Sequence, residues 1–135
     1  MRMQTTKQDD YTKVLEVLAA YYDGLYRLDV TKLRQAFSPS ATYATIANGA
    51  LLQLSIDDYF PRLAERRAPA SDNIPYDYRV VSVRFAGENT ALAVLECSLF
   101  GHDYTDLLSL LRIDGRWRIQ AKVFEGVPST AKEEN

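Results

Sequence analysis

Asp106 is the residue in this 135-residue chain whose type and position best suit acid–base chemistry. It lies in an alternating stretch, residues 104–113, where it shares the inward side of a predicted strand with leucines. Burial disfavours the charged form of a carboxyl group, so an inward aspartate can act as a general acid or base. The alternative is structural, with the carboxylate paired to an arginine or capping a helix. The sequence leaves both roles open.

Tyrosines are the second candidate source of chemistry, and the chain has nine of them. A phenol beside a buried carboxyl group can stabilise negative charge that develops on an enolate, and flat aromatic walls suit a planar ligand. We therefore expect an aromatic ligand pocket lined by Tyr22, Tyr26, Tyr43, Tyr59, Tyr104 and Trp117. The competing interpretation is that these rings fill a partly hydrated core, with their hydroxyl groups reaching the surface.

The other reactive side chains predict neither a metal site nor a cofactor. One histidine and one cysteine exclude a His-pair metal site, a multi-cysteine zinc site and an intrachain disulfide. We expect His102 to be an incidental residue of a turn, and Cys97 to be a small buried hydrophobe. Lys122 is expected on the sheet face opposite to Asp106, where it meets solvent, Glu96 or a partner subunit.

Helical periodicity marks the first part of the chain. Apolar residues at helical spacing predict a helix over residues 8–28, and Asp29 is expected to cap a second helix that ends before Pro39. Residues 48–49, Asn-Gly, predict a hairpin turn between strands at 41–46 and 50–54. Ser55 is expected to cap a third helix, in which Pro61 is expected to cause a kink.

The second half of the chain has the period of β-strands, at residues 76–85, 90–100, 104–113 and 116–124. The connections are too short for parallel crossovers, so an antiparallel meander is predicted. Long strands twist, and a curled sheet with a helix across it encloses a conical cavity. We expect one domain over residues 1–125 and a flexible tail over 126–135, in a soluble cytoplasmic protein with no membrane helix.

Several segments resemble the NTF2-like superfamily, and within it the family described as putative lumazine-binding, near the SnoaL-like group. They are residues 22–26, 37–39, 104–110, 114–119 and 122–124. The resemblance implies an α+β fold in which three N-terminal helices pack on a curved antiparallel sheet, forming a cone of the cystatin-like type. It also implies a pocket inside the cone and a homodimer formed through the outer sheet face.

Three functions are compatible with these features. The first is a small-molecule binding protein whose aromatic pocket takes an unidentified planar or apolar molecule. The second is a cofactor-independent isomerase, cyclase or dehydratase of the SnoaL or ketosteroid-isomerase type, in which Asp106 moves a proton and a pocket tyrosine stabilises an enolate. The third is an interaction module whose own side chains fill the pocket. A net charge of −2 predicts no nucleic-acid partner.

Overall fold

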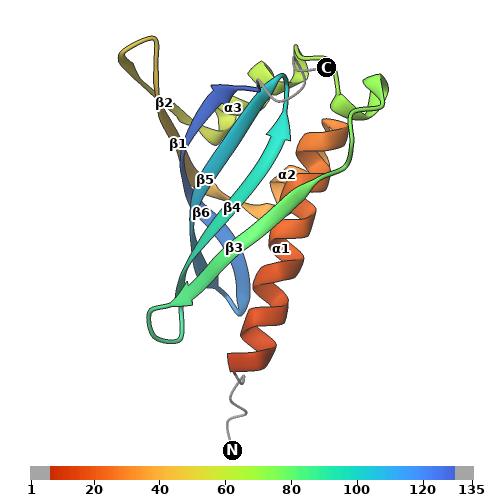
Figure 1. Cartoon of the computed structure of the whole chain (residues 1–135). Coiled ribbons are helices and arrows are strands. Elements are labelled where there is room, and N and C mark those ends of the chain that lie inside the picture. The colour runs from red at the N-terminus through yellow and green to blue at the C-terminus, as the bar shows by residue number, and fades with distance from the viewer. Residues whose placement is uncertain (1–6, 130–135) are drawn as a thin grey trace, which may run out of the picture.

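A long N-terminal helix lies across the hollow side of a curved sheet (Figure 1). The computed structural model describes residues 7–129. Its helices are α1 (Lys7–Arg27), α2 (Val30–Ala36), α3 (Ile56–Ala64) and a short 3-10 helix, η1 (Pro69–Asp72). No helix within residues 7–129 is long and apolar enough to cross a membrane.

Six strands form a single sheet in the order β2-β1-β6-β5-β4-β3. They are β1 (Phe37–Ala47), β2 (Ala50–Ser55), β3 (Tyr78–Phe85), β4 (Thr90–Leu99), β5 (His102–Ile113) and β6 (Arg116–Pro128). The meander β3–β6 is antiparallel as predicted, while β1 pairs with β6 in parallel. The fold is therefore α+β with a curved sheet, but only α1 and α2 precede the sheet, because the hairpin β1–β2 separates them from α3.

Local sequence rules account for the helices. The Asp29 side chain accepts a hydrogen bond from the Lys32 amide at 3.1 Å and so caps α2 as predicted. The close approach of α1 and α2 requires Gly24, since a Cβ atom there would lie 2.7 Å from Leu33 Cγ. The Ser55 side chain likewise caps α3, which continues through Pro61 to Ala64.

Two tight turns, β1–β2 and β4–β5, contain residues in the left-handed region of backbone conformation. Asn48 and Gly49 both have positive φ, and they close the predicted hairpin β1–β2. Phe100 and Gly101 form the same kind of turn between β4 and β5. His102 is therefore the first residue of β5 and not a loop residue, which corrects the sequence prediction. Strand β6 also continues beyond residue 125 to Pro128, and residues 130–135 of the expected tail lie outside the described part.

A β-bulge reverses the predicted orientation of the second half of β6. Arg112 pairs with Trp117 and Leu110 with Ile119, as the turn predicts, but Leu108 then pairs with Lys122. One extra residue in β6, at Gln120, moves every later side chain to the other face. The expectation that Lys122 faces away from Asp106 was therefore wrong.

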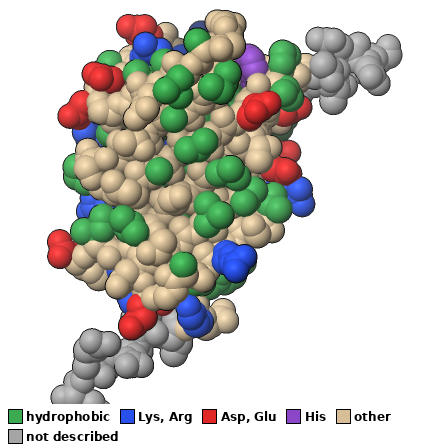
Figure 2. Space-filling view, turned by 90° about the vertical axis from the view of Figure 1, so that its left-hand side faces the viewer, with side chains coloured by type: hydrophobic (Ala, Val, Ile, Leu, Met, Phe, Trp, Pro, Cys, Tyr) green, Lys and Arg blue, Asp and Glu red, His purple; other side chains and the backbone are tan. Residues whose placement is uncertain are grey.

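The outer face of the sheet carries an apolar row that crosses four strands. Register places Val94, Leu107, Val123 and Ala44 side by side across β4, β5, β6 and β1. Leu107 is 43% exposed and Val123 is 50% exposed. Figure 2 shows hydrophobic side chains spread over this side of the molecule, with basic side chains toward its lower edge.

Candidate functional site

A cavity of about 100 Å³ lies between the C-terminal part of α1, α3 and the hollow side of the sheet. Every major element of the fold except α2 and β3 contributes to its wall. The lining residues are Leu25, Tyr43, Leu52, Tyr59, Arg62, Leu63, Arg66, Cys97, Leu99, Phe100, Tyr104, Asp106, Lys122 and Phe124. Aromatic rings and a few polar groups converge there, which is the usual composition of a ligand site.

Asp106 borders this cavity and is 1% exposed, on the helix-facing side where the sequence placed it. Tyr21 of α1 donates a hydrogen bond to Asp106 Oδ2 at 2.6 Å. Asp106 Oδ1 is buried and has no hydrogen-bond partner. Burial, and next the Asp106 charge, raise the pKa of Tyr21 well above its usual value, so the phenol stays a donor. The hydrogen bond from Tyr21 thus leaves Asp106 Oδ1 available to accept a proton or a hydrogen bond.

Lys122 extends into the same cavity from β6 and is 6% exposed. Its ammonium group donates a hydrogen bond to Tyr59 Oη at 3.3 Å. Four rings surround the nitrogen at 4.8–5.4 Å from their centroids, those of Tyr21, Tyr43, Tyr59 and Phe124. Burial alone would lower the pKa of Lys122, but Tyr59 and Asp106 raise it above its ordinary value. The group is a cation held by aromatic faces and not a neutral amine.

The mouth of the cavity is formed by α3 and the β4–β5 turn. Arg62 lies in the last turn of α3 and Arg66 lies two residues beyond the end of that helix; both are exposed, and both border the cavity. The Arg66 guanidinium lies over the Phe100 ring at 4.5 Å. Tyr104 lies beside them, and its ring occupies the space where a side chain at Gly126 would be. Glycine at this position of β6 therefore leaves room for the ring at the mouth.

Cys97 lines the cavity wall from β4 and is 7% exposed. Burial raises the pKa of its thiol to about 12, and the Asp106 charge adds to the shift. The thiol therefore stays protonated, and Cys97 is the small buried hydrophobe that the sequence predicted.

Of the six residues that the sequence proposed for ligand binding, Tyr43, Tyr59 and Tyr104 line this cavity, and Tyr22, Tyr26 and Trp117 do not. Tyr22 stacks on Tyr78 with a centroid distance of 4.6 Å, and its hydroxyl accepts a hydrogen bond from the Asp77 amide. These contacts fix the segment before β3 against α1, away from the cavity.

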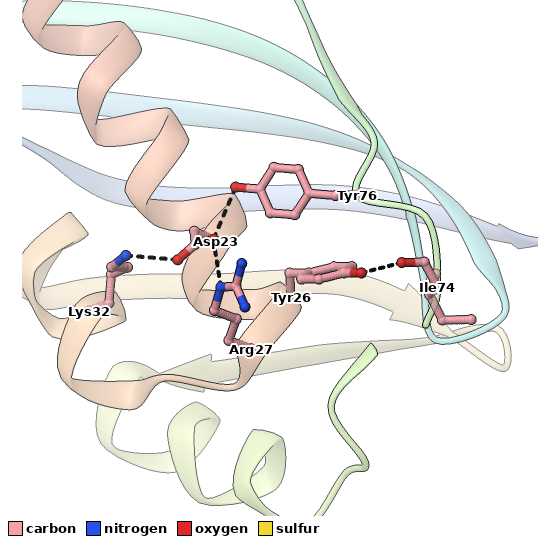
Figure 3. A network of polar contacts seen from close by, with 6 residues as sticks. All are labelled: Asp23, Tyr26, Arg27, Lys32, Ile74 and Tyr76. Carbon is pink, nitrogen blue, oxygen red and sulfur yellow. Dashed lines mark hydrogen bonds and ion pairs between the residues drawn. The ribbon is translucent and has the colours of Figure 1, made fainter. Parts of the chain in front are cut away.

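A second set of contacts holds the same segment at the end of α1 (Figure 3). Tyr26 donates a hydrogen bond to the Ile74 carbonyl. Asp23 accepts hydrogen bonds from Arg27, Lys32 and the Tyr76 hydroxyl, and the Lys32 bond contributes most to lowering the pKa of its carboxyl group. We conclude that this network is structural, since its polar groups bond to one another.

Trp117 lies at the opposite end of α1, where it closes the hydrophobic core. Its indole N–H donates to Asp10 Oδ1 at 3.2 Å, and Arg112 Nη1 lies 3.3 Å from the same oxygen. The ring packs edge-to-face on Phe85 at 5.7 Å. Trp117 also borders an open groove next to Lys13, on the outside of the fold.

The sequence offered Tyr21 only as one of several tyrosines on elements that could wall the cavity, and it did not predict Lys122 or the Arg62–Arg66 pair as site residues. Tyr21 and Tyr22 are neighbours on α1 and both are buried, so helical periodicity gives no reason to choose between them. Lys122 was missed because the bulge in β6, which the sequence did not predict, turns its side chain to the inner face. The one available signal was the presence of Arg62 and Arg66 close together at the C-terminal end of the third helix. No group of three or more His, Cys, Asp or Glu side chains within the described residues is arranged to hold a metal ion.

Comparisons with known proteins place this arrangement among its relatives. The model of the family described as "Putative lumazine-binding" matches residues 9–125. A curated protein from a Cladobotryum species, named Aldolase FrzH, is 24% identical over 121 residues, which are 88% of this chain and 93% of that protein. An NTF2-like protein of unknown function from Shewanella baltica OS155 is 26% identical, with a TM-score of 0.83 over 93% of this chain and all of its own. A further NTF2-like protein of unknown function, from Silicibacter pomeroyi DSS-3, is 22% identical, with a TM-score of 0.78 over 91% of this chain and all of its own.

Proposed function

The chain belongs to the family described as putative lumazine-binding, and from that premise we propose that its cavity binds one small organic molecule. The observation that carries the proposal is Asp106 Oδ1, a buried carboxylate oxygen without a partner at the wall of a cavity. Buried polar atoms are almost always hydrogen-bonded, and one that is not calls for an explanation such as a water or a ligand. A ligand donor would satisfy this oxygen.

The size and wall of the cavity support a ligand about as large as one ring. An engineered apolar cavity of about 150 Å³ binds benzene, so about 100 Å³ suits a single ring or a smaller molecule. The rings of Tyr43 and Tyr59 stack at 4.2 Å, and Phe124 lies 4.9 Å from Tyr43. Such faces suit a flat ligand. A larger molecule would have to extend through the mouth.

A single-ring fragment library, screened by ligand-observed NMR, tests this proposal. We expect hits whose binding is lost in Cys97→Phe, because the added ring fills the cavity from β4. The matched control is Thr105→Phe, which adds the same ring on the exposed side of β5. Native mass spectrometry and an ultraviolet–visible spectrum of freshly purified protein would detect a ligand carried from the cell. Hits that bind equally well to Cys97→Phe would contradict binding in the cavity.

A second candidate is proton transfer next to a carbonyl group, with Asp106 as the base. The arrangement of Oδ1 and Lys122 favours it, because a buried ammonium can stabilise the oxygen of an enolate. Asp106 Oδ1 would take the proton, the C–H electron pair would form the C=C bond, and the charge would move to the oxygen at Lys122. Carbon–carbon bond formation through an enolate is aldol chemistry, and one relative is named an aldolase.

Lys122 would serve this reaction as a cation and not as a nucleophile. Amine catalysis through a Schiff base needs a neutral lysine, which proteins obtain by lowering the pKa. Here the balance of burial against Tyr59 and Asp106 raises the pKa of Lys122. We therefore expect sodium borohydride to trap no adduct of pyruvate, while the wild-type protein exchanges pyruvate methyl protons in D2O and Asp106→Asn does not. Exchange that persists in Asp106→Asn would remove this candidate.

The assembly we propose is a homodimer through the outer sheet face. The apolar row Val94, Leu107, Val123 and Ala44 offers a self-complementary strip. Arg116 lies on that face at one end of β6 and Glu125 at the other. Antiparallel stacking of two copies would bring opposite charges together. Light scattering should give a dimer that Leu107→Lys converts to a monomer, with Thr90→Lys at the edge as the control.

A further inference from the structure

We propose that the cavity selects a small carboxylate that presents a neutral hydroxyl or carbonyl group to Asp106 and Lys122 and holds its carboxylate group at Arg62 and Arg66. The inference rests on the proposed binding function and names the chemical class of the ligand. It follows from the distribution of charge around the cavity, whose lining contains three cationic side chains and one carboxylate.

The inner pair of charges is balanced. Lys122 and Asp106 have opposite charges, and neither is fully hydrogen-bonded by the protein: Asp106 Oδ1 is unpartnered and the Lys122 ammonium makes one hydrogen bond, to Tyr59. An acceptor beside a donor complements a hydroxyl group, which donates to Asp106 and accepts from Lys122. A second full charge at this depth would upset the balance, so the group that enters should be neutral.

The mouth of the cavity has an excess of positive charge. Arg62 and Arg66 carry like charges at the same rim of the cavity, and no carboxylate within the described residues forms an ion pair with either. The adjacent Arg67, which does not border the cavity, bonds to Asp72. A helix C-terminus favours basic residues, but that does not require two of them to border the cavity. A ligand carboxylate would satisfy both guanidinium groups.

The positive charge of Arg66 at the mouth affects the tyrosines of the cavity wall. Burial raises the pKa of Tyr43 and of Tyr59, and the charges of Lys122 and Arg66 counteract this in both. The field of Arg66 therefore reaches the rings of the wall. Because Arg66 also lies over Phe100, its side chain is held at the mouth and does not extend freely into solvent. An anion at the mouth meets a charge that is already in place.

Three related probes separate the two ends of the ligand. 4-Hydroxybenzoate has both groups, benzoate lacks the hydroxyl group, and 4-hydroxybenzamide lacks the charge. We expect calorimetry to show 4-hydroxybenzoate binding about tenfold or more tightly than either of the others. Added salt should weaken binding of the two carboxylates and leave the amide nearly unchanged.

Variants assign each preference to its residues. In Arg62→Gln/Arg66→Gln the advantage of 4-hydroxybenzoate over 4-hydroxybenzamide should fall to about twofold or less, while Arg67→Gln, the matched control, keeps it. In Lys122→Met the advantage over benzoate should be lost, with circular dichroism confirming the fold. The mouth variants are on the surface, so the test does not depend on how a buried substitution folds.

The outcomes separate this inference from the function on which it rests. If 4-hydroxybenzamide binds as tightly as 4-hydroxybenzoate, or if the double arginine variant keeps the preference, selection of carboxylates is wrong and small-molecule binding stands. If no probe and no fragment of the screen binds in the cavity, both are wrong.

Discussion

Asp10 and Asp106 are buried aspartates, the first in the first turn of α1 and the second on β5 facing the same helix, and they differ in what surrounds them. Asp10 is in the first turn of α1, and its Oδ1 accepts from the Trp117 indole and contacts Arg112. Asp106 faces α1 further along, accepts one hydrogen bond from Tyr21 and has a buried oxygen without a partner. The Asp10 cluster (Asp10, Arg112 and Trp117) contains no member of the cavity lining, while Asp106 borders the cavity.

The comparison teaches that burial of a carboxylate does not identify a site by itself. A buried ion pair whose partners are all protein groups needs no ligand to explain it, and removing one partner leaves the other charge uncompensated. A buried carboxylate with an unpartnered oxygen next to a cavity is different, because the packing of the fold does not explain why that oxygen lacks a donor, whereas a ligand in the cavity would. Stability should therefore depend on Asp10, and ligand binding on Asp106.

The largest effect is expected at Asp10. Asp10→Ala removes the buried acceptor of the Trp117 N–H and the buried carboxylate beside Arg112, whose remaining ion pair is with the exposed Glu88, and it should lower the free energy of unfolding by about 3 kcal/mol. Urea denaturation measures the change. Glu16→Ala, an exposed acidic position on the same helix, is the control and should stay within about 0.5 kcal/mol. An equally small change at Asp10 would show that its contacts are not a stabilising cluster.

Tyr21→Phe is expected to have the next largest effect. It removes the sole side-chain hydrogen bond of Asp106 within the described structure and leaves a buried carboxylate with no donor, at a cost of about 2 kcal/mol. The same denaturation experiment measures it, with Tyr11→Phe at the exposed start of α1 as the control. No loss of stability would mean that the carboxylate finds another donor, and the comparison with Asp10 would lose its basis.

The same variant should change how stability depends on alkaline pH. Burial and Asp106 raise the pKa of Tyr21, so above pH 10 the unfolded chain releases a proton that the folded chain keeps. The contribution of the Tyr21 phenol to the free energy of unfolding is then fully present below pH 10, and it is lost as the pH rises further. Loss of this one proton should make the slope of the wild-type protein steeper than that of Tyr21→Phe by up to about 1.4 kcal/mol per pH unit. Equal slopes for the two proteins between pH 9.5 and 11 would contradict the burial of this phenol.

Local rules predicted the elements around the site from the sequence. Asp29 and Ser55 cap helices, and Asn48-Gly49 forms a hairpin, because caps and tight turns depend on residues a few positions apart. Alternation placed Asp106 on the inner face correctly.

The polar partners of Asp106 could not be predicted in the same way. The side on which Lys122 lies depends on the bulge at Gln120, and no turn residue in the sequence marks that bulge. The choice of Tyr21 over Tyr22 depends on the angle at which α1 crosses the sheet, which helical periodicity does not determine. Such long-range geometry determines which residues line the cavity and which ones pack in the core without reaching it.

The smallest effect on stability is expected from Asp106→Asn. The amide oxygen can keep the hydrogen bond from Tyr21, and the substitution removes a buried charge that the protein leaves partly unsatisfied. The lost attraction to Lys122 opposes this gain, so the free energy of unfolding should change by less than about 1 kcal/mol. Binding of 4-hydroxybenzoate should nevertheless weaken about tenfold, because the acceptor for its hydroxyl group is replaced. A stability loss as large as that of Asp10→Ala would make Asp106 a second structural aspartate, and the distinction between the two aspartates would fail.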